Sequence, residues 1–258
     1  MKMTIALSSA YAKLERADKH LADLGFWFSN SFINENTHSI IEEVEPNGNH
    51  KVLKFRLQTG SVPSQIVATI GDAVHNLRSA LDHVACAFAL QNNPGVDIGT
   101  ISFIIVKDGV TFRRPEVQKK IARLGPAGAK FLADLKPYGG DDGISLFYAL
   151  SRLDNTDKHR ALLTTKIYAA GLPNTGTSGE QNDVIFNPAN TKWESAENDV
   201  VLARWPSSDA KPDVAYISHV AFGESDISDK QPALAILDNI RGLVQFVLWS
   251  AEREIAWQ

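Results

Sequence analysis

The sequence predicts a mainly α-helical α+β protein, a helical bundle with an inserted β-hairpin and a small antiparallel sheet. Four long segments repeat apolar residues at the spacing of an amphipathic helix. The pair Asn47-Gly48, a common two-residue turn, lies between two segments rich in β-forming residues. Further β-branched runs alternate with Gly, Asn, Ser and Pro between residues 163 and 223. We therefore expect a single domain over residues 1–258, with a β-rich insertion at about 163–223.

The helical core is expected from four segments, at about 6–24, 62–91, 144–157 and 232–255. Gly25 is expected to end the first of these helices, because glycine often follows the last helical residue. Pro63 and Pro232 suit the first turns of the second and fourth helices, since an amide proton is not needed there. Shorter helices are expected at 115–124 and 127–135, and strands at 38–44, 51–57 and 100–106.

The composition is that of an ordinary globular protein, with 258 residues, 44% hydrophobic, 22% charged and a formal net charge of −4. No segment approaches the roughly 20 consecutive apolar residues that cross a bilayer, and the N-terminus lacks a secretory pattern. The single cysteine, Cys86, excludes an internal disulfide and fits a reducing compartment. We therefore expect a cytoplasmic protein with no membrane partner and no cofactor.

Positive charge in the sequence is local. Short basic groups occur at Arg113-Arg114, at Lys119-Lys120 with Arg123, and at Lys158-His159-Arg160. A domain that binds nucleic acid over a large surface is normally basic, so any contact with RNA or DNA must be local here. Each basic group is short enough to be a solvated surface.

The most unusual segment is the long helix at 62–91, which we interpret as the functional centre. Its apolar residues lie on one side, and at about 100° per residue His75, Ser79, Asp82 and Cys86 lie on the other. An exposed helix face is normally rich in Lys and Glu, yet this segment contains neither. We therefore expect both faces to be covered and the polar side chains to form a hydrogen-bonded network.

Arg78 and His83, with four residues between them, resemble the motif of the HEPN superfamily, helical proteins that dimerise and in many members cut RNA without a metal. The resemblance implies that Arg78 holds a phosphate and that His83 transfers a proton at the ribose 2′-hydroxyl. Both side chains suit these roles, because guanidinium binds phosphate oxygens and imidazole titrates near neutral pH. The resemblance also implies RNA as a partner and fits a toxin or defence role. Supporting positions on the same helix are His75, Asn76, Ser79 and Asp82.

The positions of Arg78 and His83 also predict a homodimer. They lie about 140° apart around the helix and about 7.5 Å apart along its axis, so one chain cannot easily bring both to one phosphate. Two copies of the helix could pack closely across its small residues and combine the two side chains in a shared site. These small residues are Ala68, Gly71, Ser79 and Cys86.

A second cluster of polar residues lies at the end of the helix at 144–157. Its members are Asp154, Asp157, Lys158, His159 and Arg160. They fit either a solvated surface or an anion-binding site. Together with His75–His83, the segment Leu153–Arg160 resembles a group of uncharacterised bacterial proteins. That resemblance implies no activity, but it does imply that the two segments are neighbours in space.

Two other functions fit the same residues. One is a non-catalytic structural or interaction protein, in which the polar residues form a buried network that holds the fold together. The other is a metal-dependent enzyme with His75, Asp82, His83 and His159 as ligands. Against a metal, His75 and Asp82 lie two turns apart, about 10.5 Å along the helix axis.

Overall fold

The computed structural model describes residues 7–34, 38–57, 62–139, 145–159, 165–173, 185–186, 199–223 and 231–256. As predicted, the fold is mainly helical with a smaller β part. The chain divides into a helical unit of Met1–Gly25, Ser64–Thr164 and Phe222–Gln258, and a sheet unit of Phe26–Pro63 and Thr165–Ala221. The sequence predicted one domain with an insertion, whereas here the predicted hairpin and most of the predicted insertion fall together in the sheet unit.

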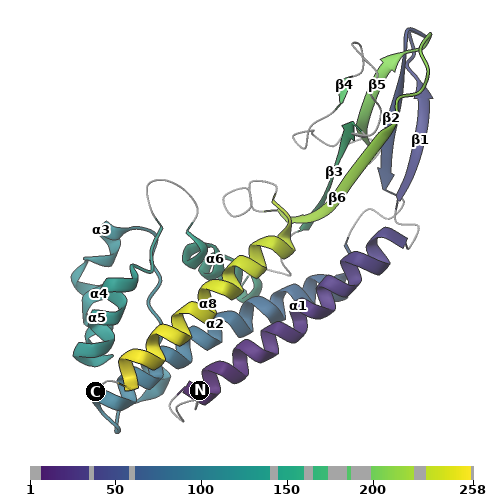
Figure 1. Ribbon diagram of the computed structural model, residues 1–258. Coiled ribbons are helices and arrows are strands. Elements are labelled where there is room, and N and C mark those ends of the chain that lie inside the picture. Colours follow the sequence, from purple (N-terminus) through teal and green to yellow (C-terminus); the bar gives the residue numbers. More distant parts are fainter. Residues whose placement is uncertain are drawn as a thin grey trace. The chain divides into compact units, whose positions relative to one another are not determined.

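The longest helices of the described residues, labelled in Figure 1, are α1 (Ser8–Asn34), α2 (Ser64–Asn92), α6 (Leu146–His159) and α8 (Ala233–Ala256). Between α2 and α6 lie η2 (Ile98–Thr100), α3 (Gly109–Phe112), α4 (Pro115–Ala122) and α5 (Gly125–Leu135). Helix α2 is the centre of the helical unit, because it packs against α5, α6 and α8. The bounds of α2, α6 and α8 lie within two residues of the predicted ones, since each helix buries one apolar face.

Gly25 does not end the first helix, contrary to the prediction. Helix α1 continues to Asn34, and Gly25 is not among the glycines with a positive φ. A glycine inside a helix lowers helix stability by only about 1 kcal/mol relative to alanine. Helical residues on both sides of Gly25 are therefore enough to keep this segment helical. The rings of Trp27 and Phe28, just after this glycine, contact each other edge to face at 5.0 Å between centroids.

Residues 100–106 form no strand ladder within the described part of the chain, so the predicted strand is wrong. The segment is nevertheless well packed, since Ile101, Phe103 and Ile104 are buried. An isolated parallel bridge joins Val106 to Tyr138. The apolar, β-branched sequence accounts for the burial, but side chains of α2 take the place of a neighbouring strand.

The sheet unit contains a four-stranded sheet in the order β1-β2-β5-β4 and a two-stranded sheet of β3 and β6. The predicted hairpin is present as β1 and β2, but it is not a separate element, because β2 also pairs antiparallel with β5. Arg56 of β2 donates to both carboxylate oxygens of the buried Asp199 at 2.7 and 2.6 Å. The strands are β1 (His38–Val44), β2 (His50–Leu57), β3 (Thr165–Pro173), β4 (Ile185–Phe186), β5 (Asp199–Pro206) and β6 (Val214–Phe222).

Among the described residues, one helix, α8, is long and apolar enough to cross a bilayer by length and composition alone. One side of α8 is buried in the helical unit. The buried Glu252 accepts a hydrogen bond from Tyr11 of α1 at 3.1 Å. Arg241 donates to both carboxylate oxygens of Asp18, also on α1, at 2.8 and 3.0 Å.

Candidate functional site

Arg78 and Asp82 of α2 together hold the backbone of Phe103. Nη2 of Arg78 donates to the carbonyl oxygen of Phe103 at 2.7 Å and to Oδ1 of Asp82 at 3.0 Å. The same Oδ1 accepts the amide proton of Phe103 at 2.8 Å. The two side chains therefore give Phe103 the hydrogen bonds that a neighbouring strand would supply. We call Arg78, Asp82 and Phe103 the clamp.

The clamp is mostly covered by protein. The side chain of Arg78 is 13% exposed and that of Asp82 is 34% exposed. Nη1 of Arg78 is buried and has no hydrogen-bond partner among the described residues. The guanidinium to which the HEPN resemblance assigns phosphate binding is thus engaged with the protein's own backbone.

His75 lies beside α6. Its Nδ1 is 3.4 Å from Oδ1 of the buried Asp154, and its Nε2 is 3.5 Å from Oγ of Ser79. One turn earlier on α2, a Cβ added to Gly71 would lie 2.6 Å from Oδ1 of Asp157, so α6 crosses α2 closely at this glycine. These contacts confirm the prediction that the two polar segments are neighbours in space.

The expectation that both faces of α2 are covered is wrong in part. The side chain of His75 is 48% exposed, Ala68 is exposed and Cys86 is half-buried. The polar face is covered only in patches, by α6 at Gly71 and by residues 100–106 at the clamp. Because the chain's own α6 covers Gly71, the small-residue stripe expected at a dimer axis is interrupted.

His83 contacts a different helix. Its Nδ1 lies 3.3 Å from Oγ of Ser9 on α1, and the residue is half-buried. Arg78 and His83 therefore contact different parts of the same chain, in keeping with their separation around the helix. Asn76 is buried and donates from Nδ2 to the carbonyl oxygen of Asp72 at 2.8 Å, a bond within α2.

In the part of the chain that the structure describes, no group of three or more His, Cys, Asp or Glu side chains is placed to hold a metal ion. The three proposed ligands on α2 each pair with a different neighbour. The side chains of Lys158 and His159, and the whole of Arg160, lie outside the described residues. Of the second cluster, Asp154 and Asp157 are placed, and both lie against α2.

Cys86 is half-buried on the same helix. Burial, and after it the Asp82 carboxylate, raises the pKa of the Cys86 thiol above its usual value. A raised pKa keeps the sulfur protonated near neutral pH and makes it a poor nucleophile. The thiol therefore offers little reactivity to this region.

A group of exposed cations lies elsewhere in the helical unit, in the stretch of chain that forms α3 and α4, two helices labelled in Figure 1. Six cations here are exposed, and the acidic residues among them are only Asp108 and Glu116. Asp108 caps α3, where its carboxylate accepts the amide proton of Thr111 at 2.6 Å, and this bond lowers the pKa of Asp108. We call the six cations the basic lobe; they are Lys107, Arg113, Arg114, Lys119, Lys120 and Arg123.

A pocket of about 110 Å³ opens beside the basic lobe, and Lys120 and Arg123 line it together with Thr100 and Ser102. Arg123 also donates to the carbonyl oxygen of Thr100 at 3.3 Å. Cations next to hydroxyl groups are suited to phosphate oxygens. Five of these six cations were noted in the sequence, where they were interpreted as a solvated surface. No local pattern reveals that the segment after η2 lies beside α4.

Comparison of the chain with protein-family models, with curated proteins and with solved structures finds no match. The HEPN resemblance therefore rests on Arg78 and His83 alone. The contacts of α2 and the charge of the basic lobe are the observations from which a function can be inferred.

Proposed function

We propose that the protein binds RNA through the basic lobe. The observation that supports this proposal is the exposure of six cations in one short stretch of a chain whose formal net charge is −4. Such a stretch attracts the phosphates of a nucleic acid, because each neutralised phosphate releases counterions. The pocket at Lys120 and Arg123 offers a place for one phosphate group. The choice of RNA over another polyanion comes from the HEPN resemblance of α2.

The double variant Lys120→Gln, Arg123→Gln is expected to bind a single-stranded RNA oligonucleotide about tenfold more weakly at moderate salt. The slope of log K against log salt should also become shallower by about 1.4, since each lost phosphate contact removes about 0.7. Fluorescence anisotropy over a salt series measures both quantities. The control is Arg16→Gln, Lys19→Gln, which removes two exposed cations from α1. An equal loss in the two double variants would contradict a specific role for the basic lobe.

Metal-independent cleavage of the bound RNA is the second function we propose, with His83 in proton transfer. It is supported by the half-buried position of His83, whose contact with Ser9 is long at 3.3 Å. A general acid or base must reach the proton that it transfers, and His83 is partly exposed, whereas the guanidinium of Arg78 is bonded to the backbone of Phe103. For Arg78 to hold a phosphate as the resemblance implies, the clamp would have to open.

Labelled RNA is expected to be cut by the wild-type protein in excess chelator and to stay intact with His83→Ala. The alanine variant loses a long hydrogen bond and the packing of a half-buried ring, so its free energy of unfolding should fall by about 1 kcal/mol while the protein stays folded. Gel electrophoresis of the RNA follows cleavage, and urea unfolding follows stability. RNA that binds to the wild-type protein and remains whole would exclude the catalytic function while leaving the binding function in place.

A non-catalytic structural role for the polar residues of α2 has direct support. These residues bond to α1 at Ser9, to α6 at Asp154 and to the backbone of Phe103. We infer that the network joins three parts of the helical unit to its central helix. A network of this kind would lose stability rather than RNA affinity when one member is removed.

A further inference from the structure

Helix α8 exposes a continuous stripe of side chains. At about 100° per residue, the members of the stripe fall within an arc of about 100° around the helix. Two large apolar rings lie near its middle, with Phe246 53% exposed and Trp249 43% exposed. We call this set the α8 stripe; its exposed members are Ala235, Asp238, Asn239, Gly242, Phe246, Trp249, Arg253 and Ala256.

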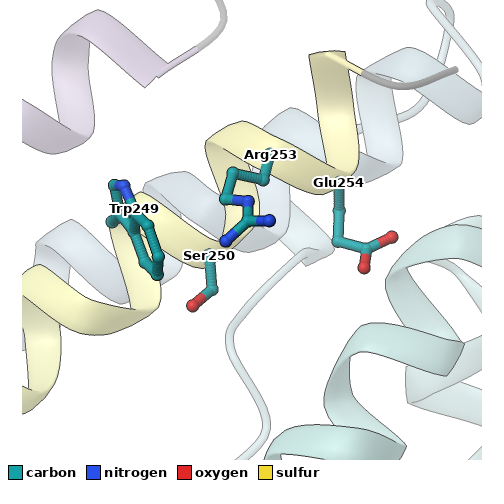
Figure 2. A pocket seen from close by; sticks show the side chains of 4 residues that line it. All are labelled: Trp249, Ser250, Arg253 and Glu254. Atoms are coloured by element: carbon teal, nitrogen blue, oxygen red, sulfur yellow. The ribbon is translucent and has the colours of Figure 1, made fainter.

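The rings of the α8 stripe are already ordered within one chain. The guanidinium of Arg253 lies over the ring of Trp249, 4.9 Å from its centroid, and the rings of Phe246 and Trp249 are 6.4 Å apart. Figure 2 shows Trp249, Ser250 and Arg253 grouped on one stretch of α8, where they line a pocket of about 370 Å³. Side chains that are held in place before a partner arrives lose less entropy on binding.

Within the part of one chain that the structure describes, no packing contact accounts for Gly242. A glycine in the middle of a helix costs about 1 kcal/mol relative to alanine, and a Cβ added to Gly242 would meet nothing within 4 Å. Its bare backbone lies on the exposed side of α8, one helical turn before Phe246. Such a glycine allows the close approach of a bulky group from outside.

The charges of the α8 stripe favour a particular partner. Asp238 and Arg253 lie at equal distances in sequence from the midpoint between Gln245 and Phe246. In a parallel pair of α8 helices each charge would face its own copy, and like charges would repel. In an antiparallel pair the aspartate of each chain faces the arginine of the other. The stripe is therefore complementary to itself in the antiparallel direction.

We propose that two copies of this chain associate through the α8 stripe as an antiparallel pair, with the two-fold axis between Gln245 and Phe246. In this alignment Asp238 lies opposite Arg253 of the second copy, and Gly242 receives the ring of Trp249 of the second copy. The inference does not depend on RNA binding. Its interface also differs from the α2 stripe, on which the sequence predicted a dimer.

Size-exclusion chromatography with light scattering over a concentration series tests the association. The wild-type protein is expected at twice the chain mass of 28.3 kDa, and Trp249→Glu is expected to be a monomer. Asp238→Arg and Arg253→Asp should each weaken dimerisation at least about tenfold, whereas the double swap should restore it to within about threefold. Glu15→Arg, an exposed charge reversal on α1, is the control and should dimerise normally.

Oxidative cross-linking tests the alignment. In a Cys86→Ser background, Gln245→Cys next to the axis should form an intermolecular disulfide rapidly, and Glu15→Cys should not. If the wild-type protein is a monomer at every concentration, the proposal is wrong and the α8 stripe does not bind a second copy of the chain. A dimer that tolerates Trp249→Glu, or a double charge swap that fails to restore association, overturns it as well.

Discussion

Replacing Asp82 with alanine is expected to lower the free energy of unfolding by about 3 kcal/mol. The substitution leaves the amide of Phe103 without its acceptor and the mostly buried guanidinium of Arg78 without its counter-ion. Residues 100–106 then lose the bonds that replace a neighbouring strand. Urea unfolding followed by circular dichroism measures the change.

The matched control for this variant is Asp72→Ala, at an exposed position of the same helix. Its stability should stay within about 0.5 kcal/mol of the wild type. A pair of variants with equal stability would contradict the structural role of the clamp. Unchanged stability combined with a loss of RNA affinity in Asp82→Ala would instead place Arg78 and Asp82 in the RNA-binding site.

Gly128→Val is expected to destabilise the protein by about 3 kcal/mol. A Cβ added to Gly128 would lie 3.0 Å from Cβ of Phe88 on α2 and 2.5 Å from Cβ of Leu124, the residue that precedes α5. A Cβ is fixed to its backbone, so the clash can be relieved only by moving α5 away from α2 and by changing the backbone at the start of α5. The contact between the tilted rings of Phe88 and Phe131, with centroids 5.0 Å apart, would be disturbed by the same movement.

The control for this clash is Gly25→Val, since a Cβ added to Gly25 meets nothing within 4 Å. Valine forms helix slightly better than glycine, so this variant should be as stable as the wild type or up to about 0.5 kcal/mol more stable. Thermal unfolding of both variants compares the two positions directly. Similar losses at Gly25 and Gly128 would contradict the close contact at Gly128 as the cause of the instability.

Local patterns were enough to locate most helices. The apolar residues of α2 and α8 recur with the helical period, and both helices lie where that period predicts them. The same local logic failed at Gly25, because glycine ends a helix only where the chain must turn. It failed again at residues 100–106, because a β-forming composition indicates burial in an extended form but does not supply a partner strand.

The pairing of strands that lie far apart in the chain could not be predicted from the sequence. The turn at Asn47-Gly48 predicted the β1–β2 hairpin, yet nothing local shows that β2 also pairs with β5, which lies more than a hundred residues further along the chain. Of the candidate site, Arg78 and Asp82 have the i, i+4 spacing at which ion pairs form, but this ion pair was not predicted. The backbone of Phe103 as their shared partner was not predictable, since a main-chain group has no sequence signal of its own.

The clamp also bears on aggregation. The run Ile101-Ser102-Phe103-Ile104-Ile105-Val106 is apolar, rich in β-branched residues and free of charge, a composition that stacks readily into intermolecular sheets when its backbone is open. Arg78 and Asp82 occupy both main-chain groups of Phe103 near the middle of this run. A strand from another molecule cannot pair with the amide and carbonyl groups of Phe103, because both are already hydrogen-bonded. The two charged side chains therefore protect the segment from intermolecular sheet formation, as a neighbouring strand would.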